Sequence, residues 1–219
     1  MKGFNWCGDL NGHKNAIIKK KYVPDATAIE MGEPIDFTVG TGVIVHARAT
    51  DFDTPIIGVS MQEKAANDGT TQLEVSVSPT ALYKYKAAKT YTMTGGSTTT
   101  AVDSSLVPTT DNFWIGGAIK IINCVADSSL NGRIVKISDS TGSGGTLTLA
   151  ETLPAVLASG DTYQLCPGYM AEGYLGYDLS SDAMHPDYDA IGGNVLKFQH
   201  SNPDTMESVW TFEKFAIVS

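Results

Sequence analysis

The sequence predicts an all-β fold, made of one or two small antiparallel β-barrel or β-sandwich domains with an extended N-terminal arm. Among the 219 residues 22 are glycine, and the chain is 42% hydrophobic and 18% charged, so it can bury a core. Serine and threonine are also abundant, and the apolar residues occur in short alternating runs bounded by Gly, Pro and Asn. These features favour short strands joined by tight turns over long helices.

The charge and the cysteines exclude several classes of protein. The formal net charge is −9 and the isoelectric point about 4.8, which argues against direct nucleic-acid binding because that requires a concentrated Lys/Arg surface. No apolar run approaches the ~20 residues of a membrane span, and the first residues show no secretory signal. The three widely spaced cysteines, Cys7, Cys124 and Cys166, are expected to be reduced and the chain to fold in a cytoplasm.

The first segment, residues 1–22, shows neither strand alternation nor helical periodicity. It contains the aromatic residues Phe4 and Trp6 and a basic run at Lys19, Lys20 and Lys21. With too few apolar residues to fold alone, it is predicted to be an extended arm. Its aromatic side chains are expected to dock on the rest of the chain or on a partner.

The second segment, residues 23–89, is predicted to be a β domain. Apolar alternation or short apolar runs indicate strands at residues 43–49, 56–61 and 73–78. Residues 62–66 are predicted to form one helical turn, and the Asn-Asp-Gly sequence that follows predicts a tight turn.

The third segment, residues 90–168, is predicted to be a second β-barrel or β-sandwich module. Whether this module is inserted into the first domain stays open. Its Thr/Ser/Gly-rich stretch at 94–100 suits a linker or an exposed hairpin tip. Strands are expected at residues 118–124, 133–138, 146–150 and 162–166. The one short helical candidate is residues 154–159.

The last segment, residues 169–219, combines an irregular loop with an aromatic strand predicted at 209–218. A strand this apolar would promote aggregation if its edges were unprotected, so it is expected to return to the sheet of the second segment. Tyr174 and Tyr177 are separated by Leu175 and Gly176 within this segment.

The motifs of several enzyme classes are absent from the sequence. It contains no GxSxG, GxxxxGK[ST] or HExxH pattern, so no catalytic residue, cofactor or metal is predicted. A calcium site in the acidic stretch from Asp178 to Asp189 stays open, although the spacing is not that of an EF-hand. A couple of Cys166 with His185 is less favoured than a buried apolar cysteine, because Leu165 and Pro167 flank the thiol.

The aromatic and basic residues support two interpretations. Trp114 beside Phe113, and Trp210 with Phe212 and Phe215, are expected in the core. The residues expected to contact a protein partner are aromatic or basic, as is common at interfaces: Phe4, Trp6, Lys19, Lys20, Lys21, Tyr174 and Tyr177.

Three stretches resemble the layout of the small decoration (cement) proteins of tailed-bacteriophage heads. They are Glu33–Phe37, Pro55–Val59 and Leu73–Pro79. Three further stretches are similar to a module of phage virion proteins: Phe113–Gly117, Asn131–Ser140 and Leu153–Gly168. All are patterns of Gly, Pro and apolar residues, and residues 1–22 and 169–219 resemble no known family.

The resemblance implies a capsid accessory protein that stabilises the phage head by bridging subunits of the major capsid protein. It would be made in the host cytoplasm and lie on the capsid exterior of the virion, as a homo-oligomer for which a trimer is the expected state. Two alternatives remain: a head-fibre or tail-associated module that binds a host glycan or protein, and an enzyme such as a glycan hydrolase. A binding module requires exposed aromatic residues, and an enzyme requires converging titratable groups in a cleft.

Overall fold

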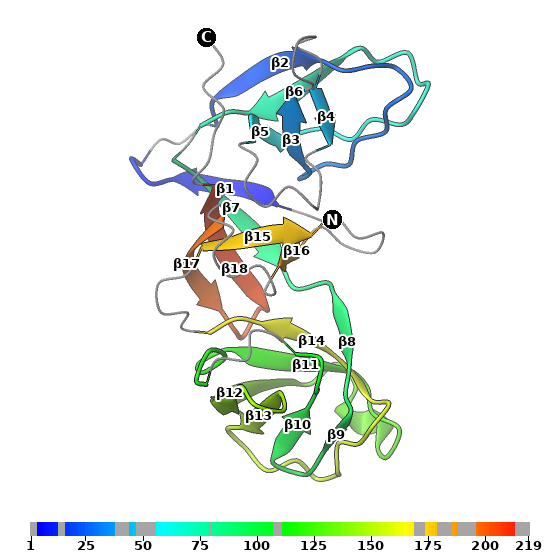
Figure 1. Cartoon of the computed structure of the whole chain (residues 1–219), viewed down its shortest axis with the longest axis vertical. Coiled ribbons are helices and arrows are strands. Elements are labelled where there is room, and N and C mark those ends of the chain that lie inside the picture. Colours follow the sequence, from blue (N-terminus) through cyan, green and yellow to red (C-terminus); the bar gives the residue numbers. More distant parts are fainter. Residues whose placement is uncertain are drawn as a thin grey trace. The chain divides into compact units, whose positions relative to one another are not determined.

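The computed structural model describes residues 4–12, 16–37, 44–46, 56–78, 80–106, 111–168, 174–178, 185–187 and 196–212. Within these ranges the fold is all-β, as predicted, with three antiparallel sheets and a single turn of 3-10 helix at Ser128–Leu130. The chain divides into two compact units (Figure 1). Unit 1 comprises residues 1–85, 173–199 and 209–219, and unit 2 comprises residues 86–172 and 200–208.

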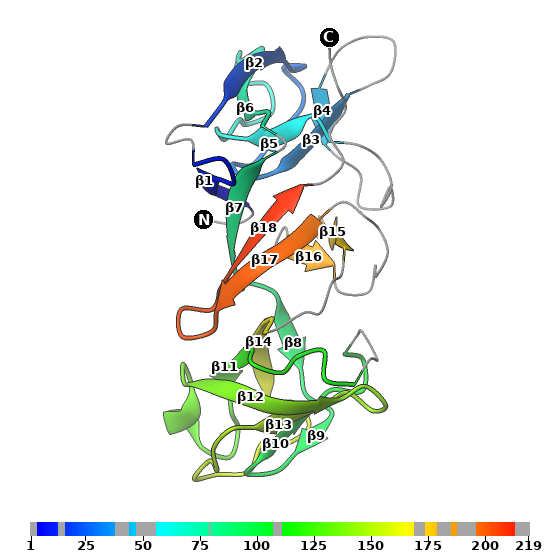
Figure 2. The ribbon, with the colours of Figure 1, turned by 90° about the vertical axis from the view of Figure 1, so that its left-hand side faces the viewer.

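Unit 1 contains most of two sheets, and the ends of β7, β17 and β18 belong to unit 2. The six-stranded sheet has the order β1 (Asn5–Asp9), β7 (Ala81–Lys86), β18 (Glu207–Phe212), β17 (Leu196–Asn202), β15 (Tyr174–Asp178) and β16 (His185–Asp187). The five-stranded sheet has the order β2 (Ile18–Tyr22), β6 (Gln72–Ser76), β5 (Gly58–Ser60), β3 (Pro34–Phe37) and β4 (Ile44–His46). Figure 2 shows β17 and β18 as a long hairpin, with β18 beside β7, so the C-terminal strand is paired with a strand of residues 23–89.

The described part of the first 22 residues, 4–12 and 16–22, contains two extended strands, but these do not form a separate arm. β1 pairs antiparallel with β7, and β2 pairs antiparallel with β6. Phe4 is 1% exposed because its ring packs on Tyr85 and edge-on against Phe212, with centroid distances of 5.7 and 5.2 Å. Burial of this ring and the two strand pairings attach the segment to unit 1.

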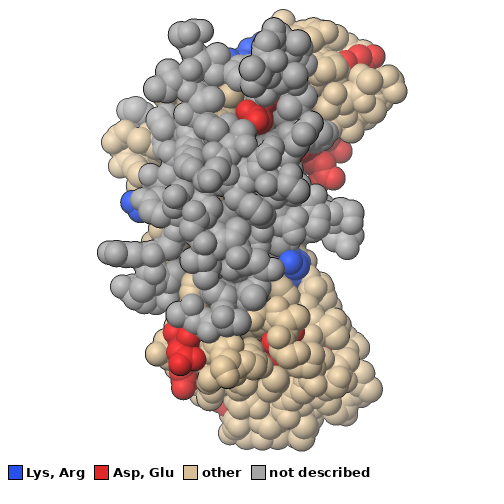
Figure 3. All heavy atoms as spheres, viewed as in Figure 1, with Lys and Arg blue, Asp and Glu red and all other residues tan. Residues whose placement is uncertain are grey.

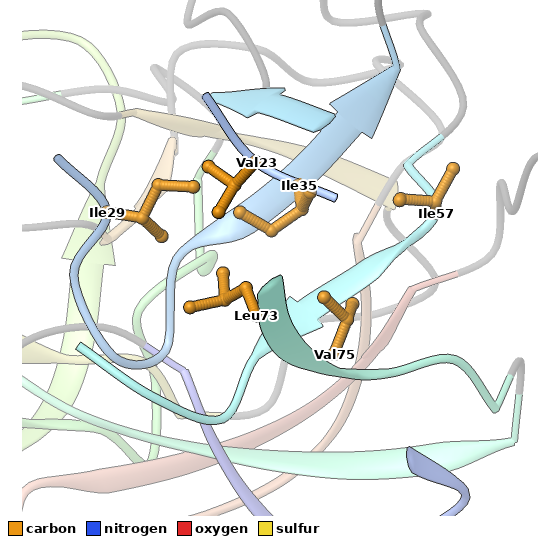
Figure 4. Packing of buried hydrophobic residues seen from close by; sticks show 6 residues of the cluster. All are labelled: Val23, Ile29, Ile35, Ile57, Leu73 and Val75. Carbon is orange, nitrogen blue, oxygen red and sulfur yellow. The ribbon is translucent and has the colours of Figure 1, made fainter. Parts of the chain in front are cut away.

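The five-stranded sheet covers an aliphatic core. Figure 4 shows its members, contributed by strands and by the loops between them: Val23, Ile29, Ile35, Ile57, Leu73 and Val75. On the other face of β6, the hydroxyl of Tyr83 donates a 2.8 Å hydrogen bond to Ser76 Oγ. This bond joins β7 of the six-stranded sheet to β6 of the five-stranded sheet.

A buried lysine stabilises the loops of the five-stranded sheet. The Lys64 side chain has no exposed surface, and its ammonium group donates to the carbonyls of Asp25 and Ala65 at 2.8 and 2.9 Å. It also lies 3.2 Å from Asp68 Oδ1. The helical turn predicted at 62–66 is wrong, because Lys64 forms an isolated β-bridge with Ile29 instead.

Unit 2 is a curled seven-stranded sheet. Its order is β8 (Thr90–Thr92), β14 (Thr162–Cys166), β11 (Ala118–Asn123), β12 (Ile134–Thr141), β13 (Thr146–Leu149), β10 (Thr100–Val102) and β9 (Gly95–Gly96). The two end strands, β8 and β9, are separated by only Met93 and Thr94, which gives the sheet its barrel-like curl (Figure 1). Residues 95–102 form the predicted hairpin.

The buried Asp103 carboxylate inside unit 2 is hydrogen-bonded through both of its oxygens. Tyr163 is fully buried and its hydroxyl donates to Asp103 Oδ2 at 3.1 Å, while Ser105 donates its amide and hydroxyl to the other oxygen of Asp103. The helical segment predicted at 154–159 is wrong, because the amide of Leu157 donates to the carbonyl of Ser97 rather than to a local carbonyl.

Candidate functional site: the edge strand β2

The described residues form no site for a metal ion: no group of three or more His, Cys, Asp or Glu among them is placed to hold one. Of the acidic stretch proposed for calcium, Asp182 and Asp189 lie outside the described residues, while Asp178 and Asp187 are described only in their backbone. In the same described ranges, no helix is long and apolar enough to cross a membrane.

Cys166 is placed as a buried structural residue. It is 1% exposed and packs with Ala87, Ala118 and Met206. Burial raises the pKa of its thiol to about 12, so the thiol is protonated at neutral pH and is a poor nucleophile. The side chain of His185 lies outside the described residues.

Of the aromatic residues expected to contact a partner, the structure describes the side chains of Phe4 and Trp6. Of the two alternatives for Phe4, the structure favours docking on the rest of the chain, because its ring is buried against Tyr85 and Phe212 and leaves 1% of the residue exposed for a partner. Trp6 lies in β1 opposite Tyr83 and is partly buried. Tyr174 and Tyr177 are in β15, and their side chains lie outside the described residues. Trp114, Trp210 and Phe212 are in the core, as predicted, whereas Phe113 is only partly buried and Phe215 lies outside the described residues.

The three lysines, in contrast, all lie on β2, the end strand of the five-stranded sheet (Figures 1 and 2). Lys19 and Lys20 are exposed and Lys21 is partly buried. The same short segment exposes apolar side chains that the sequence does not mark as contact residues: Ile17 (47%), Ile18 (46%) and Tyr22 (54%). Their position beside a lysine run is the only signal for them in the sequence.

The register of β2 on β6 shows which backbone groups face the open edge. The amide of Val77 donates to the carbonyl of Ile17 at 2.9 Å, and the amide of Val23 donates to the carbonyl of Thr71 at 3.1 Å. In an antiparallel pair, residues that exchange backbone hydrogen bonds with the neighbouring strand alternate with residues that do not. The odd-numbered residues of this stretch therefore bond β6, while the amides and carbonyls of Ile18, Lys20 and Tyr22 point away from it.

The side chains of β2 alternate between the two faces of the sheet. Lys19 is opposite Val75 and Lys21 is opposite Leu73, so both lysines share a face with core residues. Lys20 is opposite Glu74 on the other face, with Ile18 and Tyr22 flanking it on the same side of the strand. Inward-pointing charges are a recognised protection of edge strands against uncontrolled pairing.

The described basic residues do not form a continuous patch on the side of the molecule drawn in Figure 3. There the described Lys and Arg atoms appear as small separate patches, and acidic atoms lie on both units. This distribution is consistent with the net charge of −9.

Comparison of the chain with known protein families, with curated proteins and with solved structures found no match. The candidate site is therefore defined by the geometry and exposure of β2 and the residue before it.

Proposed function

We propose that this chain is a structural protein that works by binding protein surfaces, and that its role is to decorate a phage head. In that role it coats the capsid exterior and bridges neighbouring subunits of the major capsid protein, as a homo-oligomer with a trimer as the expected state. It acts without catalysis, and it is made in the host cytoplasm before it joins the virion.

The observation that carries this proposal is the concentration of exposed apolar side chains at β2. Six large apolar side chains are exposed among the described residues, and three of them lie at Ile17, Ile18 and Tyr22. Burial of apolar surface drives most protein association, and an apolar cluster on an exposed strand is a typical interaction surface. The two exposed lysines beside it restrict the partner by charge.

A modest contact at each copy is sufficient for decoration. A small protein that binds a repeating surface acts through many copies, so each interface can be near the lower end of the usual size range. An oligomer that engages several subunits at once gains further from the high effective concentration of its second and third contacts. The negative net charge would also keep free copies from adhering to nucleic acid released nearby.

Co-sedimentation of the purified chain with empty capsid shells tests the proposal. The shells are assembled from the major capsid protein encoded in the same genome, and the chain is added at increasing concentration. We expect saturable binding with a fixed number of copies per shell and a higher melting temperature of the decorated shell. Absence of binding at saturating concentration would contradict decoration, and binding to host cells instead of shells would support the host-binding alternative.

A further inference from the structure

We infer that the open edge of β2 accepts an extended acidic segment of a partner protein as an additional β-strand. The inference concerns the kind of partner, and it rests on the proposed function only for the identity of that partner as a capsid subunit. Three features of the described residues support it: backbone groups without a strand beyond them, exposed apolar side chains, and a run of lysines.

The backbone of β2 presents a template for strand addition. The amides and carbonyls of Ile18, Lys20 and Tyr22 face away from β6, and none of them bonds another described residue outside the β2–β6 pair. An extended peptide that pairs with these three residues gives these main-chain groups hydrogen-bond partners. This is the arrangement by which several domains recognise extended peptides.

A second copy of β2 is a poor occupant of this edge. Antiparallel pairing centred on Lys20 would place Lys20 opposite its own equivalent and Lys19 opposite Lys21. The neighbouring registers that keep edge-facing residues paired are shifted by two, and they set Lys19 or Lys21 opposite its own equivalent. Like charges directly opposite each other destabilise a strand pair, so the lysines disfavour self-association through β2.

An acidic strand is favoured by the same residues. On its other side Lys20 is already opposite Glu74 of β6, which is a cross-strand pair of opposite charge. A partner strand with carboxylates opposite the lysines would repeat this pairing at the open edge. Apolar partner residues opposite Ile18 and Tyr22 would then cover the exposed apolar side chains. The expected segment therefore has acidic residues in its centre and apolar residues at both ends.

A peptide titration followed by NMR tests the assignment on the full chain. The probe is an acetylated and amidated peptide of seven residues, with three glutamates between two valines and a threonine at each end. We expect the largest amide shifts at Ile18, Lys20 and Tyr22, smaller ones at Lys19 and Lys21, and weaker binding as salt is raised. The control peptide has lysines in place of the glutamates. Equal shifts with both peptides, or no shift at the edge-facing amides, would overturn the inference.

Two variants separate the backbone contribution from the charge. Lys20→Pro removes an edge-facing amide without removing a hydrogen bond to β6. Edge strands tolerate proline at positions of this kind, where the amide faces away from the neighbouring strand. Lys20→Thr removes the same charge and keeps the amide, so it is the matched control. We expect Lys20→Pro to bind the acidic peptide at least about tenfold more weakly than Lys20→Thr. Equal affinities of the two variants would contradict strand addition.

A charge reversal provides a test that does not depend on proline. The double variant Lys19→Glu with Lys20→Glu should prefer the lysine peptide over the glutamate peptide, which inverts the preference of the natural sequence. An unchanged preference would refute the role of these lysines.

If the acidic peptide fails to bind while the chain still sediments with shells, the edge assignment is wrong and decoration stands. If the peptide binds while the chain does not sediment with shells, decoration is wrong and the edge assignment stands.

Discussion

Replacing Phe4 by alanine distinguishes a docked N-terminal segment from a free arm. The ring is 1% exposed and contacts Phe212 at 5.2 Å and Tyr85 at 5.7 Å between centroids. If Phe4 were a contact residue on a free arm, its loss would weaken partner binding and leave the folded state as stable as before. In the observed fold the same change removes a core side chain from unit 1.

The expected loss is about 3 kcal/mol. Truncation of a buried phenylalanine to alanine costs about 3–5 kcal/mol, a range that includes its aromatic pair contacts. Phe4 lies just before β1, where the chain can relax into part of the cavity, so the lower end applies. With a urea dependence of about 2 kcal/mol per molar, the midpoint of the unit 1 transition should fall by roughly 1.5 M.

Urea titration followed by tryptophan fluorescence and by circular dichroism measures this shift. Ile18→Ala is the matched control, because that side chain is 46% exposed and its truncation should change stability by no more than about 0.5 kcal/mol. A loss below about 1 kcal/mol for Phe4→Ala, or equal losses for both variants, would refute the docking of Phe4 in the core.

Three further predictions concern unit 2 and the cysteines. Gly145→Ala should lower the melting temperature far more than Gly132→Ala. Both glycines have positive φ, but of the two only Gly145 is so close to a carbonyl, that of Asp103, that a new Cβ would collide with it. Similar losses of melting temperature in the two variants would contradict this packing. Tyr163→Phe should cost about 1.5–3 kcal/mol in denaturant titrations, because it removes the hydrogen bond to Asp103. Burial, then the nearby Asp103 carboxylate, raises the pKa of Tyr163 above its usual 10, so the stability that this residue contributes should be constant below pH 10 and be lost above it as the unfolded state alone ionises; above pH 10 the variant should therefore lose stability less steeply than the wild type. Iodoacetamide at pH 8 should alkylate Cys7, which is exposed, and spare the two buried cysteines; mass spectrometry identifies the modified residue, and equal labelling of all three would contradict their burial.

Strands with clear alternation could be predicted from the sequence. Leu73 and Val75 alternate with polar residues, and this stretch forms β6. Residues 162–166 form β14 with the predicted bounds. In these strands local pattern and tertiary burial agree, because one face of each strand is buried.

Elements that depend on distant partners could not be predicted in the same way. The lysine run has the sequence pattern of a solvated surface patch. Nothing in the neighbouring sequence indicates that these residues form a strand that pairs with residues 72–76. The sequence around Lys64 has the pattern of a helix with Lys64 on its surface. In the structure the side chain is buried, and its ammonium group donates to the carbonyl of Asp25, which lies far away in the sequence. Strand β7 was not predicted, although its buried residues Ala81, Tyr83 and Tyr85 alternate in the sequence as a half-buried strand requires.

The candidate site could be predicted only in part from the sequence. Lys19, Lys20 and Lys21 were expected to contact a partner, but the apolar residues beside them were not. Their importance comes from the end position of β2, which exposes Ile18 and Tyr22 instead of burying them. An edge position is a property of the whole sheet, so no local pattern could reveal it.

Hydrogen exchange of the full chain, free and bound to capsid shells, tests the central claim most directly. The claim is that the chain attaches to its partner through the open edge of β2. Binding should slow exchange at the amides of Ile18, Lys20 and Tyr22, while the amides of Lys19 and Lys21, which face β6, change little. Shell-bound protein in which the three edge-facing amides exchange as fast as in the free chain would contradict the account.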